Sequence, residues 1–381
     1  MSASLLSVDV AAAAAKLSTG RLRGPAQLPV ALARALAATA PQRLDIHLGR
    51  RQLVLAADGQ PFDAETFDLL AAVLDSGRSD GERQAALERL ETAGLLDLLV
   101  AFFAGARRVR LEAGPPAARR LDAVAERVHL TASPLAAGTR LEITGLPGRG
   151  AGLRRELERH LRYAPFAVVL DGRRLDRGLE LDDVFCAQRF AADGLDGVLG
   201  LPRQGLAART RLVVDGVLAR QIWDSPPSGA VWDAVVRCGP DNEARALGEV
   251  SRQAAEVLRR LGAHLAALAP AERARAQQLL FRLADCGAGA TAVAGMALFR
   301  DSAGRPATPG ELRRAARGRL LRAIGPQADV TRYDATGPVF VLDGRERAFV
   351  ERHLNLVVRE PPRRPRAGGR WRRWLRRRLG G

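Results

Sequence analysis

The order of helical and strand-like segments in the first 175 residues restricts the fold more than any other feature. A helix-type pattern at 28–40 begins beside Pro29 and ends before Pro41, as helices bounded by proline do. Further segments of both kinds follow in mixed order: strands at 43–48 and 52–56, helices at 64–75 and 82–104, strands at 107–112, 127–131 and 139–144, a helix at 153–163 and a strand at 167–170. Because the two kinds do not alternate strictly, we expect an α+β sandwich, with an antiparallel or mixed sheet covered on one face by helices.

The rest of the chain divides into three further segments. Strand-like runs at 197–201, 211–214 and 230–236 precede helical runs at 242–268 and 271–285. A third group has a strand at 292–299, a helix at 309–323, a strand from Pro338 and a helix at 345–353. The domains we predict are 1–175, 176–290, 291–359 and a basic tail at 360–381.

The net charge of +17 is concentrated at the C-terminal end, where nine arginines and no acid lie between residues 363 and 378. The remainder of the chain carries only +8. On a helix, Trp371, Trp374, Leu375 and Leu379 would share one face. A basic amphipathic helix of this kind suits an anionic membrane surface. It also suits nucleic acid, with tryptophan as a stacking platform, and a solvated tail is the third interpretation.

Several classes of protein are excluded by what the sequence lacks. Cys186, Cys238 and Cys286 are too far apart for a zinc motif or a disulfide framework. The sequence contains no Walker A, GxSxG, HExxH or dinucleotide-binding glycine motif. No apolar run reaches the roughly 18 residues that a membrane helix needs. We therefore expect reduced cysteines and a cytoplasmic location.

Four segments, in this order, resemble the motifs of the GHKL ATPase superfamily, which includes gyrase, the HtpG-type heat-shock chaperones, histidine kinases and MutL. They are LARALAATAPQRLDIHL, LVLAADGQPF, ETAGLLDLLVAFFAGARRVRL and AGTRLEITGL. The run RELERHLRYAPFAVVLDGRRL, from Arg155, is similar to the pattern that follows in chaperones and MutL. The resemblance is closest to the HtpG-type chaperones. It implies a Bergerat-type α/β sandwich in 1–175, a transducer-like α+β domain in 176–290 and a small C-terminal α/β unit.

The residues that hydrolyse ATP in this superfamily are replaced here. Arg34 stands where the family has the glutamate that activates water, and a guanidinium has no lone pair to accept a proton. Ala35 replaces the asparagine that holds Mg²⁺, although magnesium needs oxygen ligands. Ala38 replaces the helix aspartate, and Ala57 aligns with the aspartate that binds adenine.

Four residues remain as candidates for nucleotide binding: Asp58, Gly59, Gly94 and Thr139. Two family glycines are lost, because Pro61 and Leu96 stand in their places. The resemblance therefore implies weak or absent ATP binding, no bound magnesium and no catalytic residue.

The resulting functional hypothesis is an HtpG-like, chaperone-related protein that binds a client or partner protein and forms a homodimer. Two alternatives stay open. One is an active GHKL ATPase with a displaced site. The other is a nucleic-acid-associated protein of MutL or topoisomerase type that uses residues 363–378.

Overall fold

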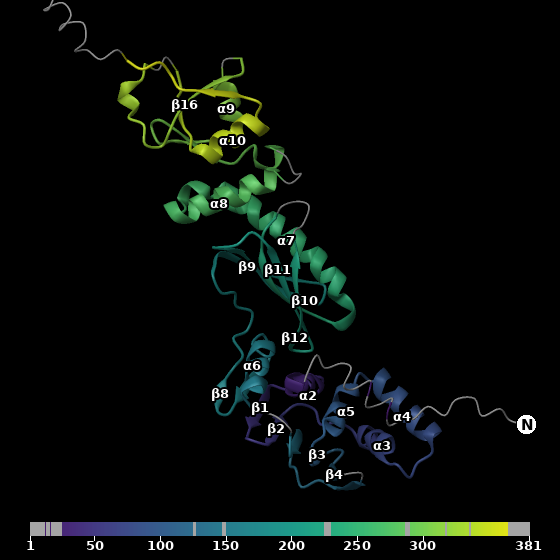
Figure 1. Cartoon of the computed structure of the whole chain (residues 1–381). Coiled ribbons are helices and arrows are strands. Elements are labelled where there is room, and N and C mark those ends of the chain that lie inside the picture. The colour runs from purple at the N-terminus through teal and green to yellow at the C-terminus, as the bar shows by residue number, and fades with distance from the viewer. Residues whose placement is uncertain are drawn as a thin grey trace, which may run out of the picture.

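The protein is described by a computed structural model whose chain builds three β-sheets in succession (Figure 1). The described residues are Ala12, Lys16 and the ranges 25–124, 127–146, 150–224, 230–285, 290–316, 318–334 and 337–364. Cys286 and almost all of the basic tail, from residue 365 onward, lie outside them. The fold is of mixed α+β type, with parallel and antiparallel strand pairs in each of the three sheets.

The first sheet has eight strands in the order β5-β4-β3-β6-β2-β1-β7-β8. The strands are β1 (Arg43–Leu48), β2 (Gln52–Ala57), β3 (Arg108–Ala113), β4 (Arg119–Val124), β5 (Arg127–Ala132), β6 (Thr139–Thr144), β7 (Ala167–Leu170) and β8 (Arg173–Arg174). All neighbouring pairs are antiparallel except β1 and β7, which run parallel. The mixed sheet that the element order predicts is therefore present.

The helices of this first unit are η1 (Pro25–Gln27), α2 (Leu28–Ala37), α3 (Ala64–Leu74), α4 (Asp80–Thr92), α5 (Leu96–Phe103) and α6 (Gly150–His160). Local sequence explains where they begin. Asp63 caps α3 by accepting a hydrogen bond from the Thr66 amide, and Ser79 and Glu82 form a reciprocal capping box at α4. The segment 82–104, which the sequence predicts as one helix, is two helices, because the chain turns at Gly94.

The core of this unit lies between the helices and one face of the sheet. Leu32 and Leu36 of α2, Leu53 and Leu55 of β2, and Phe67 of α3 are all fully buried. Alternate residues along β2 point to this core, which gives the strand its period-two burial pattern. Burial of such side chains contributes roughly 1.5–3 kcal/mol each.

The second sheet has the order β12-β11-β13-β10-β9 and supports two long helices. Its elements are β9 (Val184–Ala192), β10 (Leu195–Pro202), β11 (Ala208–Val214), β12 (Val217–Asp224), β13 (Asp233–Cys238), η2 (Pro240–Asn242), α7 (Glu243–Ala263), η3 (Leu265–Ala267) and α8 (Pro270–Leu283). Helix α7 packs on β10, β11 and β13. Cys238 is buried and Cys186 half-buried, and burial raises the pKa of both thiols.

The third sheet has the order β15-β14-β17-β16-β18, and its core is continuous with that of the second. Its elements are η5 (Ala290–Val293), β14 (Phe299–Asp301), β15 (Pro306–Ala307), α9 (Pro309–Ala315), β16 (Leu320–Ile324), η6 (Val330–Arg332), β17 (Phe340–Val341), α10 (Gly344–His353) and β18 (Val357–Arg359). Two sequence expectations are wrong here. The run 292–299 is mostly a 3-10 turn and loop, and the helix expected at 309–323 ends at Ala315, after which 320–324 forms a strand.

Direct contacts join the first unit and the second sheet. The Arg237 guanidinium on β13 donates to the Tyr163 carbonyl at 3.1 Å and to the Ala164 carbonyl at 3.2 Å. The His160 ring at the end of α6 lies 2.6 Å from the Leu218 carbonyl on β12. Val217 at the start of β12 belongs to the core of the first unit. Among the described residues, no helix has both the length and the apolar character needed to cross a lipid bilayer.

Asp122 on β4 gives a pH-dependent contribution to the stability of the first sheet. Burial alone would raise the pKa of this carboxyl, but hydrogen bonds from Arg108, Arg110 and Arg120 outweigh burial and lower the pKa. A carboxyl with a lowered folded-state pKa stabilises the fold above its unfolded-state pKa. That contribution is lost as the pH falls through the folded-state value.

We expect Asp122→Asn to lower the free energy of unfolding by about 1.5–3 kcal/mol at neutral pH, since charged hydrogen bonds are lost. The difference from the unmodified chain should shrink as the pH falls below the reference value of 3.8. Urea unfolding over a pH series measures this. Asp45→Asn is the control, because its pair with Arg43 is exposed on both sides and is worth little. A difference that stays constant with pH would contradict the prediction.

Candidate functional site

Helix α2 carries Arg34 and Ala35, the two positions where the sequence resemblance calls for a general base and a magnesium ligand, and only Ala35 is buried. Ala35 is buried in the core among leucines of the same helix. The Arg34 side chain, 38% exposed, reaches helix α5, where its Nη1 lies 3.6 Å from Oδ2 of Asp97. The place that the family resemblance assigns to a general base and a magnesium ligand therefore holds an ion pair and a methyl group.

Asp97 is a residue that sequence reasoning missed. Its side chain is only 5% exposed, although it belongs to the otherwise apolar helix LDLLVAFF. Isolated carboxylates are rarely buried without a partner. Asp97, a single acid in an apolar helix, was therefore the sequence feature that could have predicted a cationic partner such as Arg34.

Asp58 directly follows β2, and its side chain is hydrogen-bonded to the backbone at the start of β1. Its Oδ1 accepts hydrogen bonds from the amides of Gln42 at 2.9 Å and Arg43 at 2.8 Å. Its own amide donates to the Arg43 carbonyl at 3.2 Å. Ala57, one residue earlier, faces the core instead. The Asp58 carboxylate thus stabilises the end of the β1–β2 strand pair. Asp58 is exposed, on the opposite side of the strand from Ala57.

Gly59 and Thr139 lie close to Asp58, so three of the four candidates come together. A Cβ on Gly59 would stand 2.3 Å from the Thr39 carbonyl oxygen at the end of α2. Gly138 has φ +70°, and a Cβ there would stand 2.2 Å from the Ala57 carbonyl oxygen and 3.2 Å from the Asp58 Cα. The buried Thr139 pairs with Ala57 across the sheet, and among the described residues its Oγ1 has no hydrogen-bond partner.

Gly94 does not join this group and belongs to the end of α4. Its φ is +72°, its amide donates to the Glu91 carbonyl, and the Leu95 amide donates to the Leu90 carbonyl. This is the Schellman arrangement that commonly ends a helix with glycine. A Cβ on Gly94 would meet no atom within 4 Å.

The residues of α2 do not fit magnesium-bound ATP. Magnesium takes oxygen ligands, and Ala35 supplies none. The Asp97 carboxylate would repel a triphosphate near Arg34. Within the part of the chain that the structure describes, no three His, Cys, Asp or Glu side chains are grouped as a metal site.

Gly59→Ala is expected to lower the free energy of unfolding by about 2–3 kcal/mol, because the new methyl group overlaps rigid backbone at the end of α2. Gly94→Ala is the control, since its surroundings are open and only the positive φ opposes alanine, at about 1 kcal/mol. Chemical denaturation of both variants measures the difference. Equal losses would show that the close approach at Gly59 is not a constraint.

Comparisons with known proteins do not assign the chain to a family. No protein-family model matches the chain, and no curated protein matches it. Among solved structures, the ATPase domain of the mismatch repair endonuclease MutL from Aquifex aeolicus, a GHKL family member, is similar to 60% of this chain and 97% of that domain, with a TM-score of 0.35 and 11% identity. This is a weak structural similarity.

Proposed function

We propose that this chain is a binding module of GHKL-like type that does not hydrolyse ATP. The observation that supports it most is the Arg34–Asp97 ion pair between α2 and α5. It lies where the sequence resemblance calls for a carboxylate that accepts a proton, and Ala35 stands next to Arg34 in place of the amide that holds magnesium. A guanidinium cannot accept a proton, because it has donors and no acceptor.

The partner in this proposal is a protein, in keeping with the sequence resemblance to HtpG-type chaperones. A client or partner protein, a homodimer and a cytoplasmic location all belong to the proposal. ATP binds weakly or not at all in this proposal. Three of the four candidate residues for nucleotide binding have a structural role instead. Asp58 holds backbone amides, Gly59 allows a close contact and Gly94 ends a helix.

An ATPase assay with the purified chain, joined to a nucleotide titration with and without Mg²⁺, tests the proposal. We expect no turnover above the buffer rate and no gain in nucleotide affinity on adding Mg²⁺. Turnover that Asp58→Asn abolishes would instead show an active ATPase with a displaced site. The asparagine side-chain oxygen can still accept from the Gln42 and Arg43 amides, so folding is preserved. Asp68→Asn, an exposed acid on α3, is the matched control.

A further inference from the structure

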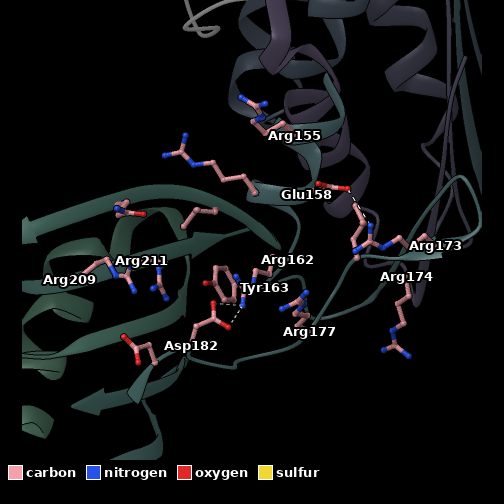
Figure 2. A pocket seen from close by; sticks show the side chains of 15 residues that line it. Arg155, Glu158, Arg162, Tyr163, Arg173, Arg174, Arg177, Asp182, Arg209 and Arg211 are labelled. Atoms are coloured by element: carbon pink, nitrogen blue, oxygen red, sulfur yellow. Dashed lines mark hydrogen bonds and ion pairs between the residues drawn. The ribbon is translucent and has the colours of Figure 1, made fainter. Parts of the chain in front are cut away.

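A hollow of about 700 Å³ lies where the first unit meets the second sheet (Figure 2). Figure 2 shows Arg209 and Arg211 on its second-sheet side and Arg155, Arg173 and Arg174 on its first-unit side, with Arg162, Tyr163 and Asp182 between them. The polar contacts of Arg237 and His160 described above hold the two sides together. The hollow is therefore bounded by elements in direct contact with one another.

The lining is strongly basic. Eight arginines face three acids: Arg155, Arg159, Arg162, Arg173, Arg174, Arg177, Arg209 and Arg211 against Glu158, Asp182 and Asp183. Asp182 already has a partner, because its Oδ1 accepts a hydrogen bond from Arg162 Nη2 at 2.7 Å. The arginines come from α6, the segment that follows it and β11. Charge of one sign gathered in a concavity attracts anions of the other.

Two of these arginines share a single buried carboxylate. Asp233 on β13 accepts from Arg209 Nε at 3.1 Å and from Arg211 Nη2 at 2.9 Å. The Arg211 side chain is 6% exposed, and among the described residues its Nη1 has no hydrogen-bond partner. Two guanidiniums against one carboxylate leave an excess positive charge, and a buried donor without a partner is costly. An anionic group in the hollow would offset this excess charge.

Three exposed arginines of the lining are available for a ligand. Within the described residues, Arg155, Arg159 and Arg177 form no ion pair, unlike Arg162, Arg173 and Arg174. Arg155 and Arg159 are four residues apart on α6 and therefore lie on the same side of that helix. They extend the positive charge away from Arg211 toward the surface.

An exposed tryptophan stands at the edge of this basic surface. Trp223 on β12 is 60% exposed and pairs across the sheet with Arg209, while Gln221 pairs with Arg211. Directly opposed residues share a face of the sheet, so Trp223 lies on the face that lines the hollow. The Arg209 guanidinium lies 5.3 Å from the centre of the Trp223 ring. This contact holds the indole in place and leaves much of its surface open.

We propose that this hollow binds single-stranded nucleic acid, with backbone phosphates against the arginines and a base stacked on Trp223. A positively charged groove with an adjacent aromatic side chain is how single strands are bound without sequence preference. A duplex keeps its bases paired and cannot stack one on Trp223. A flat lipid surface cannot reach Arg211 inside a concavity. This site is separate from α2, so its test is independent of ATP hydrolysis.

The first experiment measures binding of a labelled oligothymidylate to the full chain by fluorescence anisotropy over a salt series. The hollow variant is Arg155→Gln, Arg159→Gln and Arg177→Gln together. The control variant is Arg107→Gln, Arg127→Gln and Arg319→Gln, three exposed arginines that do not line the hollow and form no ion pair among the described residues. Both variants lose the same charge and keep the same basic tail.

We expect the hollow variant to bind roughly 40-fold more weakly at about 0.15 M salt and its log–log salt slope to fall by about 2, since each single-strand phosphate contact contributes about 0.7. The control variant should change far less. Equal losses in the two variants would overturn the proposal, because binding would then follow overall charge alone.

The second experiment tests the stacking position. We expect Trp223→Ala to weaken oligothymidylate binding about tenfold and Trp223→Phe to retain most of it, since phenylalanine still offers a ring. A duplex of equal length should bind more weakly than the single strand and be indifferent to Trp223. If tripolyphosphate or polyglutamate displaces the oligonucleotide at equal charge concentration, the hollow is a general anion site and the proposal is wrong.

Discussion

Asp233→Asn is expected to lower the free energy of unfolding by about 3–5 kcal/mol, which is the usual effect of breaking a buried ion pair from one side. The Asp233 carboxylate is 4% exposed and is the shared counter-charge of Arg209 and of Arg211, which is 6% exposed. Asparagine keeps an oxygen for one hydrogen bond but removes the charge. The Arg209 and Arg211 guanidiniums, two residues apart on the same face of β11, would then lie side by side without a counter-charge.

Urea unfolding followed by circular dichroism measures this loss. Asp196→Asn is the matched control, because Asp196 is 54% exposed and its pair with Arg237 should be worth less than about 1 kcal/mol. Adding Arg211→Met to Asp233→Asn should restore part of the stability, since the uncompensated buried charge is removed. If Asp233→Asn unfolds at the same urea concentration as the unmodified chain, the excess charge assigned to this cluster is not buried.

The sequence predicted the first sheet well because its strands have a clear period and strong turn signals. The runs 43–48, 52–56, 139–144 and 167–170 all form strands at those positions. Strand β4 was not predicted, because it begins with Arg119 and Arg120 and these two adjacent polar residues interrupt the alternation of apolar and polar side chains. The helix expected at 309–323 failed because Leu320–Ile324 pairs with β17 and β18, and a long-range partner overrides local helix propensity.

The candidate site was harder to predict from the sequence. The residue type at a motif position is the same whether its side chain binds a ligand or stabilises a turn. Asp58 and Gly59 look like the remains of a nucleotide motif, yet their atoms are engaged with the backbone of Gln42, Arg43 and Thr39. The basic hollow joins arginines as far as 56 positions apart along the chain, from Arg155 to Arg211. The arginines of α6 alone look like an ordinary solvated helix face.

Arg34→Glu, which places a carboxylate where the resemblance calls for a general base, is expected to destabilise the protein by about 2–4 kcal/mol, since solvent partly screens the 38% exposed side chain. The new carboxylate would replace a cation that lies 3.6 Å from the buried Asp97. Two like charges at about 4 Å repel by roughly 4 kcal/mol at the effective dielectric constant of a protein surface. ATP hydrolysis should not appear, because Ala35 still offers magnesium no oxygen.

A double variant separates charge from packing in this test. Arg34→Met with Asp97→Leu removes both charges and keeps side-chain volume, so its unfolding free energy should lie within about 1.5 kcal/mol of the unmodified chain. Denaturant unfolding and an ATPase assay on the single and double variants are read together. If Arg34→Glu folds with undiminished stability and turns over ATP, then α2 faces a working nucleotide pocket. The ion pair would then be a dispensable contact, and the non-hydrolysing module proposed above would be wrong.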